Sequence, residues 1–391
     1  MKFKIATTML LVSFFGKFVS GNESDEEKFK PTISPYLKVQ FWNVYSEGIQ
    51  SADGARTQER LASYFRRGRA GLKGNLLPEI SYNFMVSFDY LAKDENLSTK
   101  GTASAGTFSI WSFYFTWKLN SENDWLNITG GYFLPHLSRE STTSPWTVSS
   151  LDKTETSCYL RQFVTGKTNG ISPGINIGGT GKIGTPTLLY NFSCVNRQDK
   201  TSIQTESWSP VLLGHFMLNL GDSEFQRYKY TFSNNILKKQ KSATLGVGFS
   251  KHGETDAFES SSTIGADATI YLGGLKMDGE YYRLSRKNES KYNAECAMGR
   301  VGYNIFLKKN WILVPVVMYQ VFKGDDNYSD ASFFDGSDKI TDLGVNLISK
   351  PKNIKVNLHY IFHDGDGTKN HYISDEETPG NYAVLGIQFT I

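Results

Sequence analysis

Long hydrophobic segments are absent from this 391-residue sequence after its first 21 residues. The longest apolar run that follows, WILVPVVMY at residues 311–319, contains Pro315 and is shorter than the about 18 residues that a membrane-spanning helix needs. No sustained helical periodicity takes its place, so the helix content should be low. These absences exclude a helical membrane protein, and an architecture made mainly of β-strands is expected.

Cysteine is scarce, and net charge is nearly absent. The three cysteines, Cys158, Cys194 and Cys296, are widely spaced and form neither a CxxC motif nor a zinc-site spacing. One disulfide and isolated thiols stay open as alternatives. Three of the 42 basic residues lie within residues 1–21, so 39 remain against 39 acidic residues. No binding to nucleic acid follows from this balance, and any preference for anions must be local.

Residues 1–21, MKFKIATTMLLVSFFGKFVSG, combine a basic start, an apolar run and small residues at the end. This combination is typical of a cleaved secretory signal peptide. A polar, acidic stretch follows, so residues 22–35 are expected to form a periplasmic lead to one domain at residues 36–391. An exported chain with 14% aromatic residues and 36 glycines fits two classes: a large secreted β protein or an outer-membrane β-barrel.

Alternation of apolar and polar residues is the strongest pattern in the sequence. In EISYNFMVSFDY (79–90), every second residue from Ile80 to Tyr90 is large and apolar, and the residues between them are polar except Met85. Strict alternation predicts strands with one apolar and one wet face. Further apolar faces are formed by Trp111, Phe113, Phe115, Trp117 and Leu119; by Ile354, Val356, Leu358, Tyr360 and Phe362; and by Ala383, Leu385, Ile387, Phe389 and Ile391.

The connections between these segments alternate almost throughout between short and long. GNLLP (74–78) and GGL (273–275) are short, whereas AKDENLSTKGTASA (92–105) is long and polar. A membrane barrel has this alternation because tight turns lie on its periplasmic rim and long loops on its outer rim. Residues 221–241 interrupt the pattern unless they form one periplasmic connection, and that interpretation leaves an even number of 16 strands around an aqueous lumen.

The fold class predicted from these patterns is all-β, a 16-stranded antiparallel transmembrane β-barrel in the outer membrane. Its aromatic face would contact lipid and lipopolysaccharide, and its polar face would line a water-filled pore. The acidic loop sequences at 324–330 and 363–371 could bind Ca²⁺, but solvated outer loops are the preferred interpretation. The six histidines are scattered, and neither a metal nor a cofactor is expected.

The segment YFRRGRAGLKG concentrates positive charge. On a strand, Arg67, Arg69 and Lys73 share one face and would form a cationic ladder along the lumen wall, which lowers the barrier for anions. The alternative is that these cations pair with acids of a neighbouring strand, such as Asp89. Arg66 falls on the opposite face, where it would extend to the membrane interface or lie at a subunit contact.

The same segment resembles a known family. RRGRAGLKG is similar to the RRARLGLKG-type second strand of the phosphate-selective porin O and P family. YLKVQFWNVY resembles the first strand of that family, and GYFLPHLSRESTTS (131–144) resembles its fifth strand, where a Gly, an aromatic residue and a Pro lead into a long loop. The KKN turn (308–310), the strand WILVPVV and the final strand also fit, so the resemblance extends over nearly the whole chain after the signal peptide.

The resemblance implies a homotrimeric porin whose third outer loop, about residues 136–171, folds inward as a constriction loop. Basic residues line this route in the family, and here the loop contains Arg139, Lys153 and Arg161 beside acids such as Asp152. The expected function is passive diffusion of small hydrophilic solutes, biased toward phosphate or other small anions. No Ser–His–acid set lies on adjacent strands, so no enzyme is expected; an outer-membrane enzyme or an adhesin without channel activity is the alternative.

Overall fold

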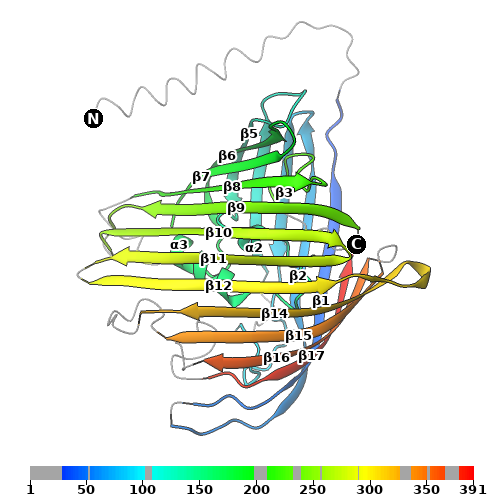
Figure 1. Cartoon of the computed structure of the whole chain (residues 1–391), viewed down its shortest axis with the longest axis vertical. Coiled ribbons are helices and arrows are strands. Elements are labelled where there is room, and N and C mark those ends of the chain that lie inside the picture. The colour runs from blue at the N-terminus through cyan, green and yellow to red at the C-terminus, as the bar shows by residue number, and fades with distance from the viewer. Residues whose placement is uncertain are drawn as a thin grey trace, which may run out of the picture. The chain divides into compact units, whose positions relative to one another are not determined.

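Sixteen long strands and one two-residue strand form a single antiparallel sheet in the computed structural model (Figure 1). The structure describes residues 29–51, 53–101, 108–197, 209–231, 239–255, 258–288, 290–325, 336–349, 353–365 and 378–391. All of the strands belong to one unit, Thr32–Ile391. The predicted signal peptide, most of the predicted lead, and acidic loop residues 326–330 and 366–371 lie outside the described residues.

The strands have the following bounds: β1 (Ser34–Ser46), β2 (Arg60–Leu77), β3 (Ile80–Ser87), β4 (Ser109–Lys118), β5 (Asn127–Phe133), β6 (Ser172–Lys182), β7 (Thr187–Val195), β8 (Val211–Gly221), β9 (Gln240–His252), β10 (Ser260–Gly273), β11 (Leu275–Lys287), β12 (Lys291–Tyr303), β13 (Ile305–Phe306), β14 (Trp311–Lys323), β15 (Ser337–Ser349), β16 (Ile354–Gly365) and β17 (Tyr382–Thr390). Helices α2 (Arg139–Thr142) and α3 (Glu155–Thr165) lie between β5 and β6, and the 3₁₀ turn η2 (Lys308–Asn310) precedes β14. None of the described helices combines the length and the apolar composition needed to cross a bilayer.

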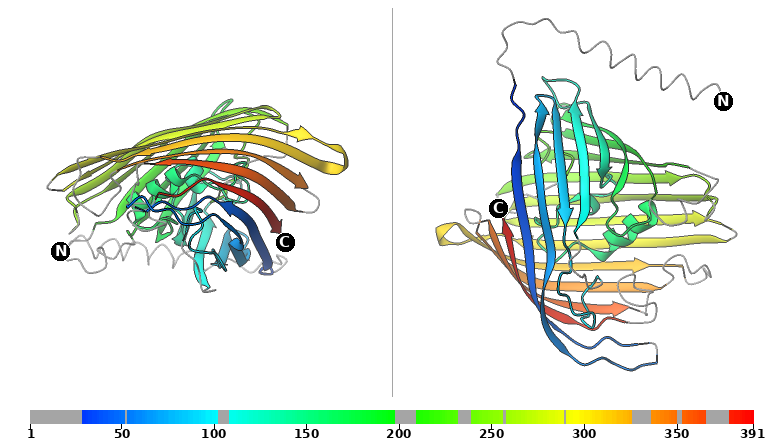
Figure 2. Two further views of the ribbon diagram at one scale, coloured as in Figure 1. Left: turned by 90° about the horizontal axis from the view of Figure 1, so that it is seen from below. Right: turned by 180° about the vertical axis from the view of Figure 1, so that it is seen from behind.

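The sheet closes on itself because the last strand pairs with the first. β17 runs antiparallel to β1, with Phe41 opposite Ile387 and Val44 opposite Val384, and both views in Figure 2 show the curved wall that results. β12 pairs directly with β14, while β13 only extends the turn between them, so sixteen strands surround the lumen. The predicted 16-stranded antiparallel barrel is confirmed.

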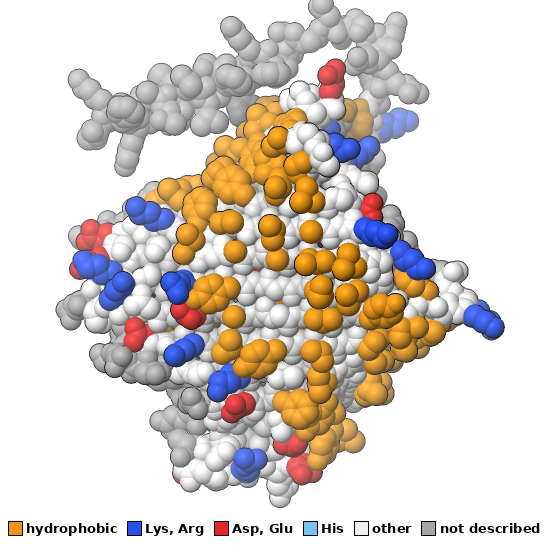
Figure 3. All heavy atoms as spheres, in the orientation of Figure 1, with side chains coloured by type: hydrophobic (Ala, Val, Ile, Leu, Met, Phe, Trp, Pro, Cys, Tyr) orange, Lys and Arg blue, Asp and Glu red, His pale blue; other side chains and the backbone are white. Residues whose placement is uncertain are grey.

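The alternation of the sequence decides which side chains face outward. In β16, Leu358 and Phe362 are 61% and 44% exposed, whereas Lys355 and His359 on the other face are buried. Hydrophobic side chains cover much of the outer face in Figure 3, and charged ones gather toward the end of the strands at which β9 finishes. Because lipid offers no hydrogen bonds, only a closed sheet can present such a face to it.

A β-bulge in β2 reverses the predicted direction of Arg66. Gln40 of β1 lies opposite Arg67, but the next residue, Phe41, lies opposite Phe65, which leaves Arg66 as the extra residue. A bulge shifts the phase of one strand by one residue, so Arg66 and Arg67 both point inward. The prediction that Arg66 faces lipid or a subunit contact is therefore wrong.

A second bulge moves Trp111 away from its predicted face. Met85 of β3 lies opposite Ser112 and Val86 lies opposite Ile110, so Trp111 is the extra residue of β4. The guanidinium of Arg69, which points inward, lies 3.8 Å from the centre of the Trp111 ring. The prediction that Trp111 shares the lipid-facing row of β4 is wrong, because alternation cannot reveal a bulge.

The short and long connections lie at opposite rims, since the strands are antiparallel and sequential. Short turns join β2 to β3 at residues 78–79, β6 to β7 at 183–186 and β10 to β11 at residue 274. β8 and β9 are joined at the same rim by residues 222–239, and the described part of this connection, 222–231, contains no strand. That residues 221–241 lie in the periplasm stays a prediction.

Candidate functional site

The connection between β5 and β6, residues 134–171, packs against the inward faces of the strands. Its residues are buried almost throughout, and α2 and α3 lie on the concave side of the sheet (Figure 2). Helix α3 begins after Thr154, whose side chain accepts the N–H of Ser157, and ends at Gly166 in the left-handed conformation. Local capping signals therefore start and stop a helix whose partners are the strands of the wall.

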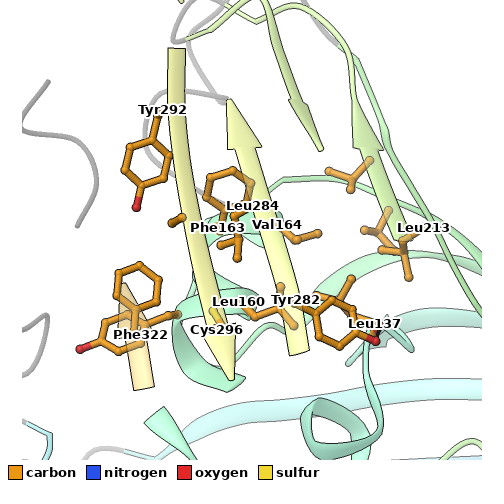
Figure 4. Close-up of a cluster of buried hydrophobic side chains, with 14 of the residues drawn as sticks. Leu137, Leu160, Phe163, Val164, Leu213, Tyr282, Leu284, Tyr292, Cys296 and Phe322 are labelled. Atoms are coloured by element: carbon orange, nitrogen blue, oxygen red, sulfur yellow. Dashed lines mark hydrogen bonds between the residues drawn. The ribbon is translucent and has the colours of Figure 1, made fainter. Parts of the chain in front are cut away.

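One face of α3 enters a buried apolar cluster that it shares with β8, β11, β12 and β14 (Figure 4). The ring centres of Tyr159 and Phe322 lie 4.4 Å apart, and those of Phe163 and Tyr292 lie 6.2 Å apart. Full burial of one such side chain stabilises a fold by about 1.5–3 kcal/mol. Hydrophobic burial therefore holds α3 against the wall independently of any charge.

Three aspartates of the strands hold the same connection by hydrogen bonds. These bonds run from the Arg139 N–H to Asp267 at 3.3 Å, from the Leu151 N–H to Asp342 at 2.7 Å, and from the Tyr159 hydroxyl to Asp338 at 2.5 Å. Each carboxylate also contacts a histidine ring, in the pairs His215–Asp267 (2.7 Å), His359–Asp342 (2.6 Å) and His363–Asp338 (2.7 Å). Buried carboxylates need such partners, so the histidines support the acids that fix the connection.

Arg300 of β12 links the connection to two strands at once. Its Nη2 lies 2.8 Å from Oε2 of Glu140 and 2.5 Å from Oδ2 of Asp278, and its Nη1 donates to the hydroxyl of Ser150 at 2.7 Å. Only 2% of Arg300 is exposed. A cation buried so deeply is tolerated because carboxylates surround it, and removing it would leave those carboxylates uncompensated.

The β8–β9 connection meets the β5–β6 connection from the rim of the short turns. Glu224 forms a bidentate ion pair with Arg139, with N–O distances of 2.8 and 2.9 Å. The Tyr228 hydroxyl donates to Oδ1 of Asn191 at 2.7 Å, and the ring of Tyr230 lies 5.1 Å from that of Phe133. Two connections from opposite rims thus pack against each other on the inner side of the wall.

His136 lies where these two connections meet. Its Nε2–H donates to the carbonyl of Tyr230, and its Nδ1 accepts an N–H of Asn191 at 3.2 Å. Both ring nitrogens are therefore satisfied in the neutral form, and a second proton would face another donor. Burial lowers the pKa of His136 from 6.5 to about 3, although the bond to the Tyr230 carbonyl opposes the shift.

Acid is expected to weaken the contact between the two connections. Between pH 6.5 and about 3, the unfolded chain protonates His136 and the folded chain does not. The free energy of unfolding should therefore fall with falling pH, by up to about 1.4 kcal/mol per pH unit from this group. The check is the temperature of heat-induced unfolding in detergent from pH 7 to 4. A variant His136→Gln should show a smaller acid-induced decrease, and an equal decrease in both proteins would contradict the assignment.

Arg67 and Arg69, the first two residues of the predicted ladder, point inward and are paired with acids. The Nη2 of Arg67 lies 2.6 Å from Oδ1 of Asp152, and the Nη2 of Arg69 donates to Oδ2 of Asp89 at 2.8 Å. For Arg69, this is the pairing with a neighbouring acid that the sequence left open. For Arg67, the acid comes from the β5–β6 connection instead of a neighbouring strand.

The three cations that the sequence assigned to the constriction loop lie in two places. The Lys153 ammonium donates to the carbonyl of Ser141 at 2.6 Å, and the Arg161 guanidinium donates to the same carbonyl and to the Ser141 hydroxyl at 3.1 Å. Burial, and then the nearby Arg161 charge, hold the pKa of Lys153 well below its ordinary value. Arg139 points elsewhere, to Glu224. The structure thus brings Lys153 and Arg161 together and separates Arg139 from them.

Lys73 and Lys38 stand apart from the paired cations. Lys73 is exposed, and its ammonium lies 5.8 Å from the ring centre of Tyr36. Lys38 of β1 lies 5.7 Å from the same ring and 5.8 Å from that of Trp146. Over the ranges of the chain that the structure describes, neither lysine has an acidic partner within ion-pair distance. The sequence analysis missed Lys38, although alternation in β1 places it on the face of Trp42.

Residues 43–391 match the family model of the phosphate-selective porins O and P. The chain belongs to this family. The barrel of this porin is similar to the anion-selective porin from Comamonas acidovorans, with a TM-score of 0.59, 13% identity, and 93% of this chain and 100% of that chain covered. The outer membrane channel DcaP of Acinetobacter baumannii gives a TM-score of 0.55 at 15% identity, with 95% and 100% covered.

A third similar structure is OmpF of Salmonella typhi in complex with daunomycin, with a TM-score of 0.58, 11% identity, and 92% of this chain and 97% of that chain covered. No curated protein sequence matches the chain. At these identities the structural likeness concerns the fold. The family and the fold together are those of an outer-membrane channel rather than an enzyme.

Sequence reasoning also missed the cations that gather around Asp152 in this porin. Arg66 reaches Asp152 only because of the bulge in β2, and Lys100 reaches it from the β3–β4 connection. Burial alone would raise the pKa of Asp152, but the nearby Arg66, Arg67 and Lys100 hold it far below its ordinary value. No local signal in the sequence marks these contacts. In the part of the chain that the structure describes, no cluster of His, Cys, Asp or Glu could hold a metal ion.

Proposed function

We propose that this porin forms a water-filled channel for the passive diffusion of small hydrophilic solutes, with a bias toward phosphate or other small anions. The observation that carries the proposal is the contrast between two groups of inward cations. Arg67 and Arg69 are each paired with an aspartate, whereas Lys38 and Lys73 contact only aromatic rings. A cation without an acidic partner on a pore wall attracts anions and repels cations.

The proposed route follows the inner faces of β1, β3 and β4. Inward side chains there remain partly exposed, including Tyr36, Lys38, Asn83 and Tyr114. On β12, in contrast, the alternate inward residues are buried beneath the β5–β6 connection. This contrast supports the proposal that residues 136–171 are the constriction loop, because they fill one side of the lumen and leave the other side to the solute.

The bias toward anions is expected to be moderate. Each paired arginine carries its own counter-charge, so the field along the route comes mainly from Lys38, Lys73 and the Lys153–Arg161 pair. Lys153 and Arg161 lie beside Asp152 and Glu140 on the same connection, which reduces their effect on a passing ion. The chemistry of these groups supports small anions as a class more strongly than one particular anion.

The surroundings of the channel are also part of the proposal. Membership of the porin family supports a homotrimer in the outer membrane, to which a cleaved signal peptide at residues 1–21 would direct the chain. The outward hydrophobic face supports contact with outer-membrane lipid, and the polar loops of the opposite rim from the short turns would meet lipopolysaccharide.

Current recording from the detergent-purified, heat-modifiable protein in a planar bilayer tests the channel itself. Stepwise insertions are expected, and each insertion should close in three levels if the protein is a trimer. Single closing levels would keep the channel and reject the trimer. Folded protein that produces no current steps would contradict the proposal and favour the alternative of a barrel with an enzymatic or adhesive role.

A further inference from the structure

Asp152 of the β5–β6 connection lies where three cations converge. Its Oδ2 lies 2.5 Å from Nη2 of Arg66 and 3.7 Å from Nζ of Lys100, and its Oδ1 lies 2.6 Å from Nη2 of Arg67. The backbone N–H of Lys153 donates to Oδ1 at 2.6 Å. A carboxylate of the chain itself therefore occupies a site built from two guanidinium groups, an ammonium group and a backbone amide, which are donors that suit oxyanions.

Arg66 is held in place by contacts that do not involve this carboxylate. Its guanidinium carbon lies 5.3 Å from the ring centre of Trp42 and 4.5 Å from that of Tyr90, both within the range of cation–π attraction. The bulge in β2 fixes the backbone that directs Arg66 inward. The position of this cation would therefore persist if the Asp152 carboxylate left the site.

Arg67 and Lys100 have independent contacts as well. The Nη1 of Arg67 donates to Oε1 of Gln40 at 3.1 Å, and the amide of Gln40 is in turn fixed by Gln388 at 2.9 Å. The Lys100 ammonium donates to the carbonyl of Lys153 at 3.0 Å. All three cations are thus preorganised, and binding an external anion among them would cost little ordering of side chains.

The charges in this cluster do not balance. Arg66, Arg67 and Lys100 carry three positive charges, and the negative charges are those of Asp152 and of Glu155, which pairs with Lys100. One positive charge remains in excess with Asp152 in place, and two remain without it. A divalent anion would neutralise that excess of two, and a tetrahedral oxyanion would bring more acceptor oxygens than a carboxylate does.

We infer that Arg66, Arg67 and Lys100 form a binding site for divalent tetrahedral oxyanions, and that the Asp152 carboxylate occupies this site in the free channel. The inference rests on the proposed anion channel, since the oxyanion reaches the cluster from the lumen. The side chains of Arg67, Lys100 and Asp152 keep 8–9% of their surface exposed, which gives the cluster an opening. Asp152 then acts as a tethered competitor that keeps the binding of oxyanions by the wild-type channel weak.

Sulfate is the appropriate probe because it is divalent throughout the neutral pH range. The measurement is the sulfate concentration that halves the chloride current, in the wild-type channel and in Asp152→Asn, whose side-chain amide has the shape of the carboxylate without its charge. The variant should be blocked at a concentration at least about tenfold lower, because the competitor has lost its charge. Equal half-blocking concentrations in folded, conducting variant and wild-type channels would overturn the inference.

Glu224→Gln is the matched control, since it also removes a buried carboxylate that pairs with an arginine of the lumen side. It leaves the three cations unchanged, so its half-blocking concentration should equal that of the wild type. If the two variants became equally sensitive, the effect would come from a loosened β5–β6 connection, and the inference would be wrong.

A second variant keeps the inference testable if Asp152→Asn fails to fold. Lys100→Gln removes one cation and should raise the half-blocking concentration of sulfate, whereas Lys100→Arg should not; equal values for all three proteins would overturn the inference. Calorimetric titration of the detergent-solubilised barrel with sulfate separates this result from the proposed function. Tighter sulfate binding by Asp152→Asn in a protein without channel activity would retain the site and reject only the channel.

Discussion

Replacing Lys38 and Lys73 together by glutamate is expected to convert a channel that favours anions into one that favours cations. The two substitutions change the charge facing the route by four units. One unit charge at about 7 Å in water changes the energy of a passing monovalent ion by about 0.6 kcal/mol, so four units give about 2.4 kcal/mol, more than a tenfold change in permeability. The measurement is the reversal potential in a KCl gradient at low ionic strength, where screening is weakest.

Two further variants show whether the effect belongs to the lumen. Lys38→Gln with Lys73→Gln should give a reversal potential between those of the wild type and the glutamate variant. Lys251, which is exposed on the outer face of β9, offers a control, since Lys251→Glu adds acid without facing the route and should leave the reversal potential unchanged. The same potential in the wild type and the double glutamate variant would mean that solutes do not pass these lysines.

The second large effect is expected from Arg300→Met. This change leaves Glu140 and Asp278 as buried carboxylates without their shared cation, which costs about 3–5 kcal/mol in comparable buried pairs. It also removes the bond to Ser150, so the β5–β6 connection loses contacts at two points along its length. We expect a lower temperature of heat-induced unfolding and a larger single-channel conductance, because the connection would no longer be held against β12.

Arg283→Met is the matched control for this prediction. Arg283 also pairs with a carboxylate, Glu295 at 3.4 Å, but its side chain is 68% exposed on the outer surface. Exposed pairs contribute little to stability, so this variant should keep the unfolding temperature and the conductance of the wild type. If Arg300→Met behaved like Arg283→Met, the buried network would not be what holds the connection in place.

The strands could be predicted because their pattern is local. Alternation placed Leu358 and Phe362 on the outer face of β16, and the structure confirms this. The number of strands followed from the alternation of short and long connections, and the treatment of residues 222–231 as a connection was needed to obtain it. Arg66 and Trp111 were placed on the wrong face because a bulge depends on the partner strand, which the pattern of a single strand does not contain.

The contacts of the site were harder to predict because they are long-range. Arg67 was expected in a ladder or paired with a neighbouring strand, but its partner Asp152 lies 85 residues further along the chain. The tight packing of Glu224 against Arg139 likewise joins two connections that no local signal relates. Lys38 is different: it follows the alternation of β1, and only the attention given to the arginine-rich segment kept it out of the prediction.

The measurement that tests the central claim most directly is the reversal potential of the wild-type channel in a planar bilayer under a KCl gradient. A potential displaced toward that of chloride is the predicted result, since Lys38 and Lys73 are the inward cations without an acidic partner among the described residues of β1 and β2. A potential displaced toward that of potassium would contradict the account, because the paired arginines and the acids of the β5–β6 connection would then control the passage of ions.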